Sequence, residues 1–250
     1  MDGARSKIVE ELKLPLEGGM ARAGTVYVTF KADLSKYVAH RPAILQWIVN
    51  PEASFGDLGM GLLRAIQPWY EWIMGWGFDI SKGEPQVTEA QVRARLNTFV
   101  GEEVQQVEIE KVSYWYVNQT WATQYSVGRV FCGGDAGHRH PPSSSLGSNT
   151  CMQDAFNLGW KLAYVLKGWA KPALLESYSD ERAPVGKQIV ARANQSRFDY
   201  KHLKAVFGFD QGVQTQAEML QRIFAETPEA AEIREKLYQA LAIKHYEFNA

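Results

Sequence analysis

The sequence predicts an α+β fold, with an antiparallel sheet in the first half of the chain and helices in the second. Two patterns lead to this expectation. Most of residues 25–117 consists of short apolar or aromatic runs separated by turn-forming residues, which is typical of strands. After residue 150, apolar residues recur every three or four positions, as they do on one face of a helix. The chain has 250 residues and is 46% hydrophobic, so it can bury a substantial core.

The expected strands are rich in β-branched and aromatic residues, which suit a pleated, half-buried surface. They cover residues 25–30, 43–49, 72–80 and 104–117. Residues 62–66 fit a strand or a helix, because so short an apolar run has no decisive period. Ahead of these strands lies a short amphipathic run that contains Ile8, Val9, Leu12 and Leu14.

One helix is expected within the first half. Thr88 can cap its start, and Gln91 three residues later completes a capping box. Gly101 predicts its end, because glycine tolerates the left-handed conformation that often follows a helix. The side chains expected on its buried face are Val92, Leu96, Phe99 and Val100.

Helices are expected throughout the second half. Residues 152–166 have a helical period and Gly168 marks its end, which predicts a central helix. Pro184 is expected to end or kink the next helix, because proline lacks the backbone N–H that the helix needs. Two further amphipathic helices are predicted at residues 217–225 and 229–246.

The strongest chemical signal lies at residues 127–163. An apolar strand at 127–131 leads into a turn with Gly134 and Asp135, and then into a loop of proline, serine and glycine. A long helix follows this loop, and its start would offer unpaired backbone N–H groups and a positive dipole end. A carboxylate beside a helix start suits a ligand with a hydroxylated chain and an electron-rich ring edge.

This segment resembles the second flavin-binding motif of the single-component flavoprotein aromatic hydroxylases, especially the phenol and 2,4-dichlorophenol monooxygenase branch. The stretch Asp2-Gly3-Ala4-Arg5 resembles the family's Asp-Gly fingerprint, and residues 174–186 resemble the family as well. The resemblance implies that Asp135 holds the ribityl hydroxyls of FAD and that the helix start faces the flavin ring and pyrophosphate. The cofactor-binding residues it implies are Asp2, Gly3, Gly134, Asp135, Pro142, Gly147, Ser148 and Asn149.

The resemblance implies a remnant of the flavin hydroxylase fold, in which an antiparallel substrate-domain sheet packs on the residual flavin-domain strand and helices. We expect a flavin-domain remnant at residues 1–24 and the substrate-binding sheet at 25–126. A flavin-domain portion with the Gly-Asp motif is expected at 127–204, and C-terminal helices at 205–250.

The resemblance also implies truncation at both ends, since the match covers only the middle of the family's length. The first βαβ unit, whose Gly-x-Gly-x-x-Gly turn binds a dinucleotide pyrophosphate, is expected to be absent. The sequence offers only an imperfect substitute, in which Arg64 follows Gly59 and Gly61 in place of the third glycine. The family's thioredoxin-like domain is expected to be absent at the other end.

One residue departs from the family's pattern. Ser145 stands where the family usually has glycine before a Leu-Gly pair. Glycine permits positive φ and close approach of the backbone to a ligand, and serine accommodates both less well. We therefore expect altered contact with the flavin ring.

By resemblance, the protein is an FAD-dependent monooxygenase that hydroxylates a phenolic or polyketide-derived aromatic substrate. FAD would be its cofactor and NAD(P)H its reductant. The expected substrate-binding residues are Trp115, Tyr116 and Trp121, which precede the Gly-Asp segment closely in sequence.

Two other functions stay open. The chain could be a cofactor-independent isomerase, cyclase or dehydratase that reuses the substrate pocket, with Asp135, His138 or His140 as acid or base. Alternatively, it could be a non-catalytic binding or partner subunit, held as a homodimer or by a complementing chain.

Composition narrows the remaining classes. The chain has 27 basic and 28 acidic residues and a net charge of -1. Because it has no excess of basic residues, we expect it to bind neither nucleic acid nor a membrane. Its two cysteines, Cys132 and Cys151, predict no disulfide framework and favour the cytoplasm. No further histidine lies at zinc-ligand spacing from His138 and His140, so no metal is expected.

Overall fold

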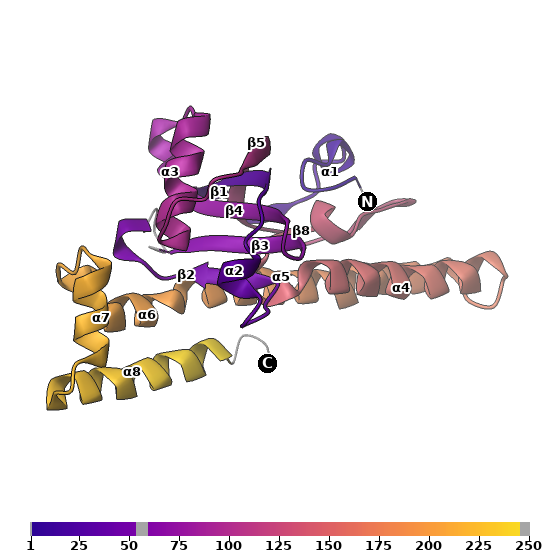
Figure 1. Cartoon of the computed structure of the whole chain (residues 1–250). Coiled ribbons are helices and arrows are strands. Elements are labelled where there is room, and N and C mark those ends of the chain that lie inside the picture. The colour runs from indigo at the N-terminus through magenta and orange to yellow at the C-terminus, as the bar shows by residue number, and fades with distance from the viewer. Residues whose placement is uncertain (1, 54–59, 246–250) are drawn as a thin grey trace. The chain divides into compact units, whose positions relative to one another are not determined.

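The computed structural model describes residues 2–53 and 60–245, which form two compact units (Figure 1). Among these residues, unit 1 contains the chain up to Arg22 together with Val117–Phe198. Unit 2 contains Ala23–Tyr116 and Asp199–His245. Two positions named in the sequence analysis lie outside the described residues: Gly59, of the imperfect Gly-x-Gly-x-x-Gly sequence, and residue 246, at the end of the last predicted helix.

Unit 2 is built on an antiparallel sheet. It contains β2 (Leu45–Ile48), β3 (Gly61–Gln67), β4 (Glu71–Phe78) and the parts of β1 (Leu16–Lys31) and β5 (Glu108–Ala122) that lie within Ala23–Tyr116, in the order β2-β3-β4-β1-β5. Antiparallel pairing joins β2 to β3, β3 to β4 and β4 to β1. Alternate residues of β1 face the core, so Val26, Val28 and Phe30 are each 0% exposed. The α+β class and the antiparallel sheet are confirmed, and residues 62–66 belong to a strand.

The helix predicted from Thr88 is α3 (Glu89–Val100). The Thr88 hydroxyl accepts a hydrogen bond from the Gln91 N–H at 3.3 Å, and the Gln91 side chain accepts one from the Thr88 N–H at 2.9 Å. Gly101 ends the helix with a φ of 91°, as expected of a glycine C-cap. The buried face, formed by Val92, Leu96 and Phe99, packs in the core of the sheet.

Four more α-helices belong to the described part of unit 2. They are α2 (Ser35–Val38), α6 (Tyr200–Phe207), α7 (Gln216–Phe224) and α8 (Pro228–His245). α7 and α8 confirm the two predicted C-terminal helices, whereas α2 and α6 were not expected from the sequence. α6 packs against α8, and a Trp47–Tyr200 ring pair with centroids 4.8 Å apart joins β2 to α6.

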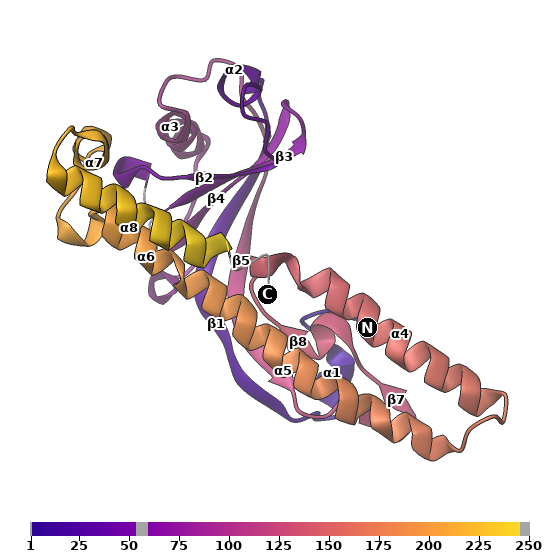
Figure 2. The same cartoon turned by 90° about the horizontal axis from the view of Figure 1, so that it is seen from below.

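Two long helices lie side by side in unit 1, α4 (Gly147–Leu166) and α5 (Glu176–Phe198) (Figure 2). The smaller elements of this unit are α1 (Lys7–Glu11), β6 (Ser126–Val127), β7 (Val130–Phe131) and β8 (His138–Arg139). β8 pairs with the end of β5, where Thr120 faces Arg139 and Trp121 faces His138. The turn that links β7 to β8 is therefore held beside α4 and α5, which both contact this region.

Two expectations for unit 1 differ from the structure. The strand expected at residues 127–131 is a hairpin of β6 and β7, because Gly128 has a φ of 57° and reverses the chain. Pro184 does not end α5, which continues to Phe198. Pro184 and Asp180 are both exposed, so solvent can satisfy the Asp180 carbonyl that loses its helical donor.

α4 has its charged residues inside and its apolar residues outside. Its two charged side chains, Asp154 and Lys161, are 1% and 0% exposed. The amine of Lys161 donates to Ser177 Oγ at 2.7 Å and pairs with Glu181 at 2.9 Å. The large apolar side chains on the opposite face are exposed, namely Met152, Phe156, Trp160, Tyr164 and Leu166. We call these five residues the α4 stripe.

The expected central helix therefore forms, but its apolar stripe is not covered by the described residues. Phe156 is 76% exposed and Leu166 is 83% exposed. Within the described residues, no helix combines the length and apolar character needed to cross a membrane. An apolar stripe of this kind on a protein surface is typical of a contact surface.

We predict that the α4 stripe binds an apolar dye such as ANS in the folded protein. Replacing Phe156 and Leu166 by Ser should lower the dye fluorescence, while the free energy of unfolding changes by only about 0.5 kcal/mol because both side chains are already exposed. Ile44→Ser, at an exposed apolar residue of unit 2, is the matched control. Equal fluorescence from the double variant and the unchanged protein would contradict the prediction.

Candidate functional site

Two glycines, Gly133 and Gly134, shape the turn that follows β7. Gly134 has a φ of 61°, a left-handed conformation that favours glycine. A Cβ on Gly133 would lie 2.5 Å from the Tyr178 hydroxyl. That hydroxyl donates a 2.7 Å hydrogen bond to the Cys132 carbonyl. Both positions therefore require glycine, one for its conformation and the other for its contact with α5.

Asp135 follows these glycines with its side chain exposed. Among the described residues, its carboxylate receives one long contact, 3.8 Å from the Cys151 thiol on α4. Arg139 bonds the backbone instead, because its guanidinium donates to the carbonyls of Asp135 and Ala136 at 3.4 Å each. The carboxylate oxygens are thus available to accept hydrogen bonds from a hydroxylated ligand.

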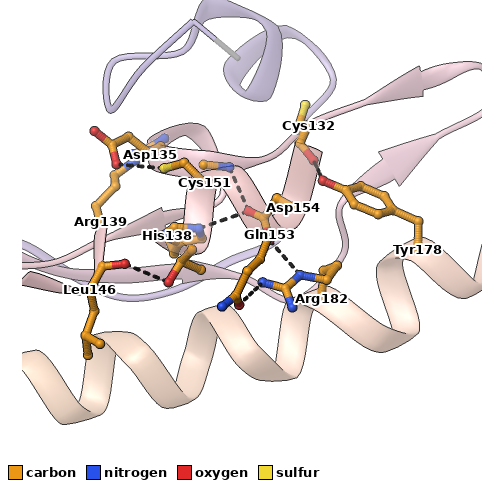
Figure 3. Close-up of polar contacts among 12 residues, drawn as sticks. Cys132, Asp135, His138, Arg139, Leu146, Cys151, Gln153, Asp154, Tyr178 and Arg182 are labelled. Carbon is orange, nitrogen blue, oxygen red and sulfur yellow. Dashed lines mark hydrogen bonds and ion pairs between the residues drawn. The ribbon is translucent and has the colours of Figure 1, made fainter. Parts of the chain in front are cut away.

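Asp154 of α4 lies behind the turn and collects three donors (Figure 3). Its Oδ2 accepts from the Gly134 N–H at 2.9 Å and from His138 Nε2 at 3.0 Å, and its Oδ1 accepts from Arg182 Nε at 2.7 Å. Burial by itself would raise the pKa of Asp154. Hydrogen bonds from His138, Gly134 and Arg182 outweigh it and hold the pKa below its usual value. Asp154 is therefore a carboxylate at neutral pH.

His138 is 0% exposed and donates from Nε2 to Asp154. In the neutral ring this tautomer leaves Nδ1 as an acceptor, and Nδ1 is buried without a hydrogen-bond partner among the described residues. The acid–base role predicted for His138 would therefore require a ligand to reach a fully enclosed side chain.

His140 lies at the start of α4. Its Nδ1 donates to the Pro141 carbonyl at 2.7 Å, so the neutral ring keeps a lone pair on Nε2. A Cβ on Gly147, the first residue of α4, would lie 3.7 Å from this Nε2. Burial lowers the pKa of His140, and the ring is consequently neutral at neutral pH. Among the three predicted acid–base residues, Asp135 and His140 are the ones with solvent access.

The start of α4 has no side-chain cap. Leu146 occupies the N-cap position, and the first turn carries no acidic residue. Ser148 and Asn149 are exposed there, and the Asn149 amide donates to the Ser145 carbonyl at 3.3 Å. Ser145 has a φ of 51°, so this chain does use the positive φ at the position where glycine was expected. Pro142 opens the short turn that leads into this helix start.

Packing of the α1 segment brings Asp2 near residues that flank the Gly-Asp turn. Val9 and Leu14 form a buried cluster with Cys132 and Ala136, which flank the turn. Asp2 precedes α1, and a hydrogen bond from Ser6, the α1 N-cap, lowers the pKa of Asp2. Its charge also acts on the Arg139 guanidinium. Two motifs about 130 residues apart in the sequence therefore meet within one unit.

The three aromatic residues expected to bind substrate belong to different units. Trp115 and Tyr116 lie in the unit 2 part of β5, and the Tyr116 hydroxyl donates to Glu84 at 2.7 Å. Trp121 lies in unit 1, where its indole donates to Glu17 at 3.1 Å. Their substrate-binding role stays a prediction.

The sequence reasoning missed Asp154, Tyr178 and Arg182, which hold the turn from behind. A signal for Asp154 was present. Asp154 and Lys161 are the only charged residues between Gly147 and Leu166 and are seven residues apart, so they lie on one face of the helix. Two charged side chains on the same face of an otherwise apolar helix indicate that both are buried and paired with other residues.

Comparisons with known proteins agree with this geometry. The model of the FAD binding domain family matches residues 1–193. The 2,4-dichlorophenol 6-monooxygenase of Cupriavidus pinatubonensis is 44% identical over 252 residues, which cover 100% of this chain and 42% of that protein. The phenol 2-monooxygenase of a Pseudomonas species is 42% identical over 254 residues, which cover 100% of this chain and 40% of that protein.

Solved structures of flavin-dependent enzymes have the same fold over this chain. The flavin-dependent monooxygenase PieE, in complex with FAD and substrate, superposes with a TM-score of 0.88 and 38% identity, over 99% of this chain and 43% of its own. RebC with bound 7-carboxy-K252c superposes with a TM-score of 0.78 and 27% identity, over 100% of this chain and 43% of its own. The chain thus spans about two fifths of the length of these relatives, and the expected fold is confirmed.

We predict that Ser145→Gly raises the free energy of unfolding by up to about 1 kcal/mol. Relief of the left-handed backbone is worth about 1–2 kcal/mol, which exceeds the entropic cost of glycine, about 0.5–1 kcal/mol. Ser143→Gly in the same loop, where no positive φ occurs, should be neutral or destabilising. Urea unfolding measures both. A loss of stability in Ser145→Gly as large as that in Ser143→Gly would refute the strain.

We also predict that His140 makes stability depend on pH. Burial lowers the folded-state pKa of His140 below the ordinary histidine value of about 6.5, so the unfolded chain binds the proton more readily. This contribution to stability is therefore complete above about 6.5 and is lost as the pH falls through the folded-state pKa. Urea unfolding between pH 8 and 5 should show a smaller loss for His140→Gln than for the unchanged protein. His40→Gln, at an exposed histidine, should behave like the unchanged protein.

Proposed function

The chain belongs to the family of FAD-binding aromatic hydroxylases, and from this premise we propose that its unit 1 forms the flavin-facing part of an FAD site. The substrate class we propose is a phenolic or polyketide-derived aromatic ring, with NAD(P)H as the reductant. The observation that carries the proposal is that the Asp135 carboxylate lies beside Cys151 in the first turns of the uncapped helix α4, while the Asp2 charge acts on Arg139 in the same segment. FAD bound here would supply the redox chemistry that divides molecular oxygen between the substrate ring and water.

The residues of this site fit a flavin with a ribityl chain. Asp135 offers an exposed, acceptor-only carboxylate, which matches the hydroxyl donors of such a chain. The uncapped first turn of α4 offers backbone N–H groups at Gly147 and Ser148, which match an electron-rich ring edge or a phosphate. Tyr178 and Asp154 fix the backbone on either side of Gly133.

His140 is the residue we propose for proton movement beside the ring. Its neutral imidazole has Nδ1–H committed to Pro141 and Nε2 unprotonated. Nε2 can accept a hydrogen bond or a proton from a phenolic hydroxyl held at the α4 start. His138, which is buried, would hold the Asp154 carboxylate and not act on substrate.

The adenosine half of FAD has no obvious place among these 250 residues, which contain no Gly-x-Gly-x-x-Gly sequence. Remote parts of a ligand normally supply binding energy that holds its reactive part in place. We therefore propose that these residues alone bind FAD weakly and bind riboflavin almost as well, since both present the same ring and ribityl chain.

Flavin titration with Asp135→Ala tests the proposal. The loss of hydrogen bonds to a charged acceptor, worth about 1.5–3 kcal/mol, should weaken flavin binding about 10- to 100-fold. Asp180→Ala removes an exposed carboxylate of α5 and should leave the affinity unchanged. Flavin fluorescence quenching and visible absorbance measure the binding.

The alternatives give different results. No flavin uptake by the unchanged protein at high FAD would sink the proposal. Conversion of a phenolic substrate without NAD(P)H would then favour the cofactor-independent isomerase, cyclase or dehydratase. Absence of any turnover would favour a non-catalytic partner role.

A further inference from the structure

Asp154 is the point where three segments of unit 1 meet. It belongs to α4, Arg182 belongs to α5, and Gly134 with His138 belong to the turn and strand that follow β7. A buried carboxylate with three donors is well compensated. One of these donors is the backbone N–H directly before Asp135, which distinguishes this group from an ordinary buried ion pair.

From this geometry we infer that Asp154 is a positioning residue, which fixes the Gly134–Asp135 backbone so that the Asp135 carboxylate is presented to the flavin. The inference rests on the proposed function. Arg182 and His138 in turn hold the Asp154 carboxylate in place. None of the three touches the ligand in this assignment.

The turn needs such a restraint because two consecutive glycines form it. Gly133 is extended, with a φ of -174°, and Gly134 is left-handed, with a φ of 61°. Glycine visits many other backbone conformations at similar energy, so the local sequence does not select this one. The direction of Asp135 must therefore be fixed by contacts from outside the turn.

Hydrogen bonds on both sides of Gly133 supply these contacts. Tyr178 holds the Cys132 carbonyl before Gly133, and Asp154 holds the N–H of Gly134 after it. Tyr178 and Arg182 are four residues apart in α5, so they lie on the same face of that helix. One face of α5 thus holds the turn directly, through the Tyr178 hydrogen bond, and indirectly, through the bond of Arg182 to Asp154.

A carboxylate is required at position 154 because three donors converge on it. Both oxygens are used, Oδ2 by Gly134 and His138 and Oδ1 by Arg182. Asparagine has the same size but accepts at one oxygen only, and its NH₂ group would face a donor. Asp154→Asn therefore breaks one side of this contact set while the packing volume is kept.

The first readout does not involve FAD. In Asp154→Asn, we expect the Gly134 amide resonance to shift and the amides of residues 133–137 to exchange faster with solvent. The amides of Val26 and Val28, in the core of unit 2, should keep their protection. Asp180→Asn, at an exposed carboxylate, should change neither set.

The second readout is flavin affinity. We expect Asp154→Asn to weaken FAD binding about tenfold or more through the displaced turn. Lys161→Met is the matched control, because Lys161 is the other buried charge of α4 but bonds Ser177 and Glu181 and not the turn. It should lower stability while it leaves the Gly134 amide and the FAD affinity unchanged.

The outcomes separate this inference from the proposed function. If the unchanged protein binds no FAD, the proposed function fails, and an unshifted Gly134 amide in Asp154→Asn would overturn the positioning role as well. If the unchanged protein binds FAD and a folded Asp154→Asn binds it equally well, the inference is overturned while the function stands. An equal loss of FAD affinity in Lys161→Met would also overturn it, since the effect would then follow stability alone.

Arg182→Lys covers the case in which Asp154→Asn does not fold. It keeps the positive charge beside Asp154 and removes the Nε–H donor. We expect a smaller shift of the Gly134 amide and a smaller loss of FAD affinity in the same direction. No change in either quantity would overturn the inference.

Discussion

The buried carboxylate of Asp154 is the constraint on which the arrangement of unit 1 depends. A charge removed from water must be matched by donors or it costs several kcal/mol. The donors come from α5, from β8 and from the glycine turn, so satisfying one carboxylate fixes three segments at once. The same requirement turns the charged face of α4 inward and leaves the α4 stripe outside. The polar centre and the apolar surface thus have one cause.

The sequence predicts the regular parts of this fold well, because local physics determines them. The alternation of Val26, Val28 and Phe30, and the capping box at Thr88, gave a strand and a helix that the structure confirms. Pro184 does not end α5, because it lies on the exposed face, where solvent can satisfy the carbonyl that loses its helical donor. α6 was not predicted, because eight residues form only about two turns, too few for the helical spacing of Tyr200, Leu203 and Val206 to stand out from the segments on either side.

The candidate site divides in the same way. Asp135 and the α4 start follow from a motif that is continuous in sequence, and their mutual proximity was foreseen. Asp154, Tyr178 and Arg182 act on the turn from two helices, and their partners are defined only by tertiary packing. The approach of Asp2 to Arg139 likewise depends on the cluster that buries Val9. The spacing of Asp154 and Lys161 indicates that both charges are buried, but it does not indicate which residues they contact.

The close contact between Gly133 and the Tyr178 hydroxyl couples the two positions during divergence of the sequence. A side chain at 133 would collide with the tyrosine, whereas a smaller residue at 178 would release the Cys132 carbonyl. A substitution at either site is harmful as long as the other site keeps its present residue. The two sites, 45 positions apart in the chain, are therefore epistatic. Descendants of this sequence should therefore exchange the pair jointly or keep both residues.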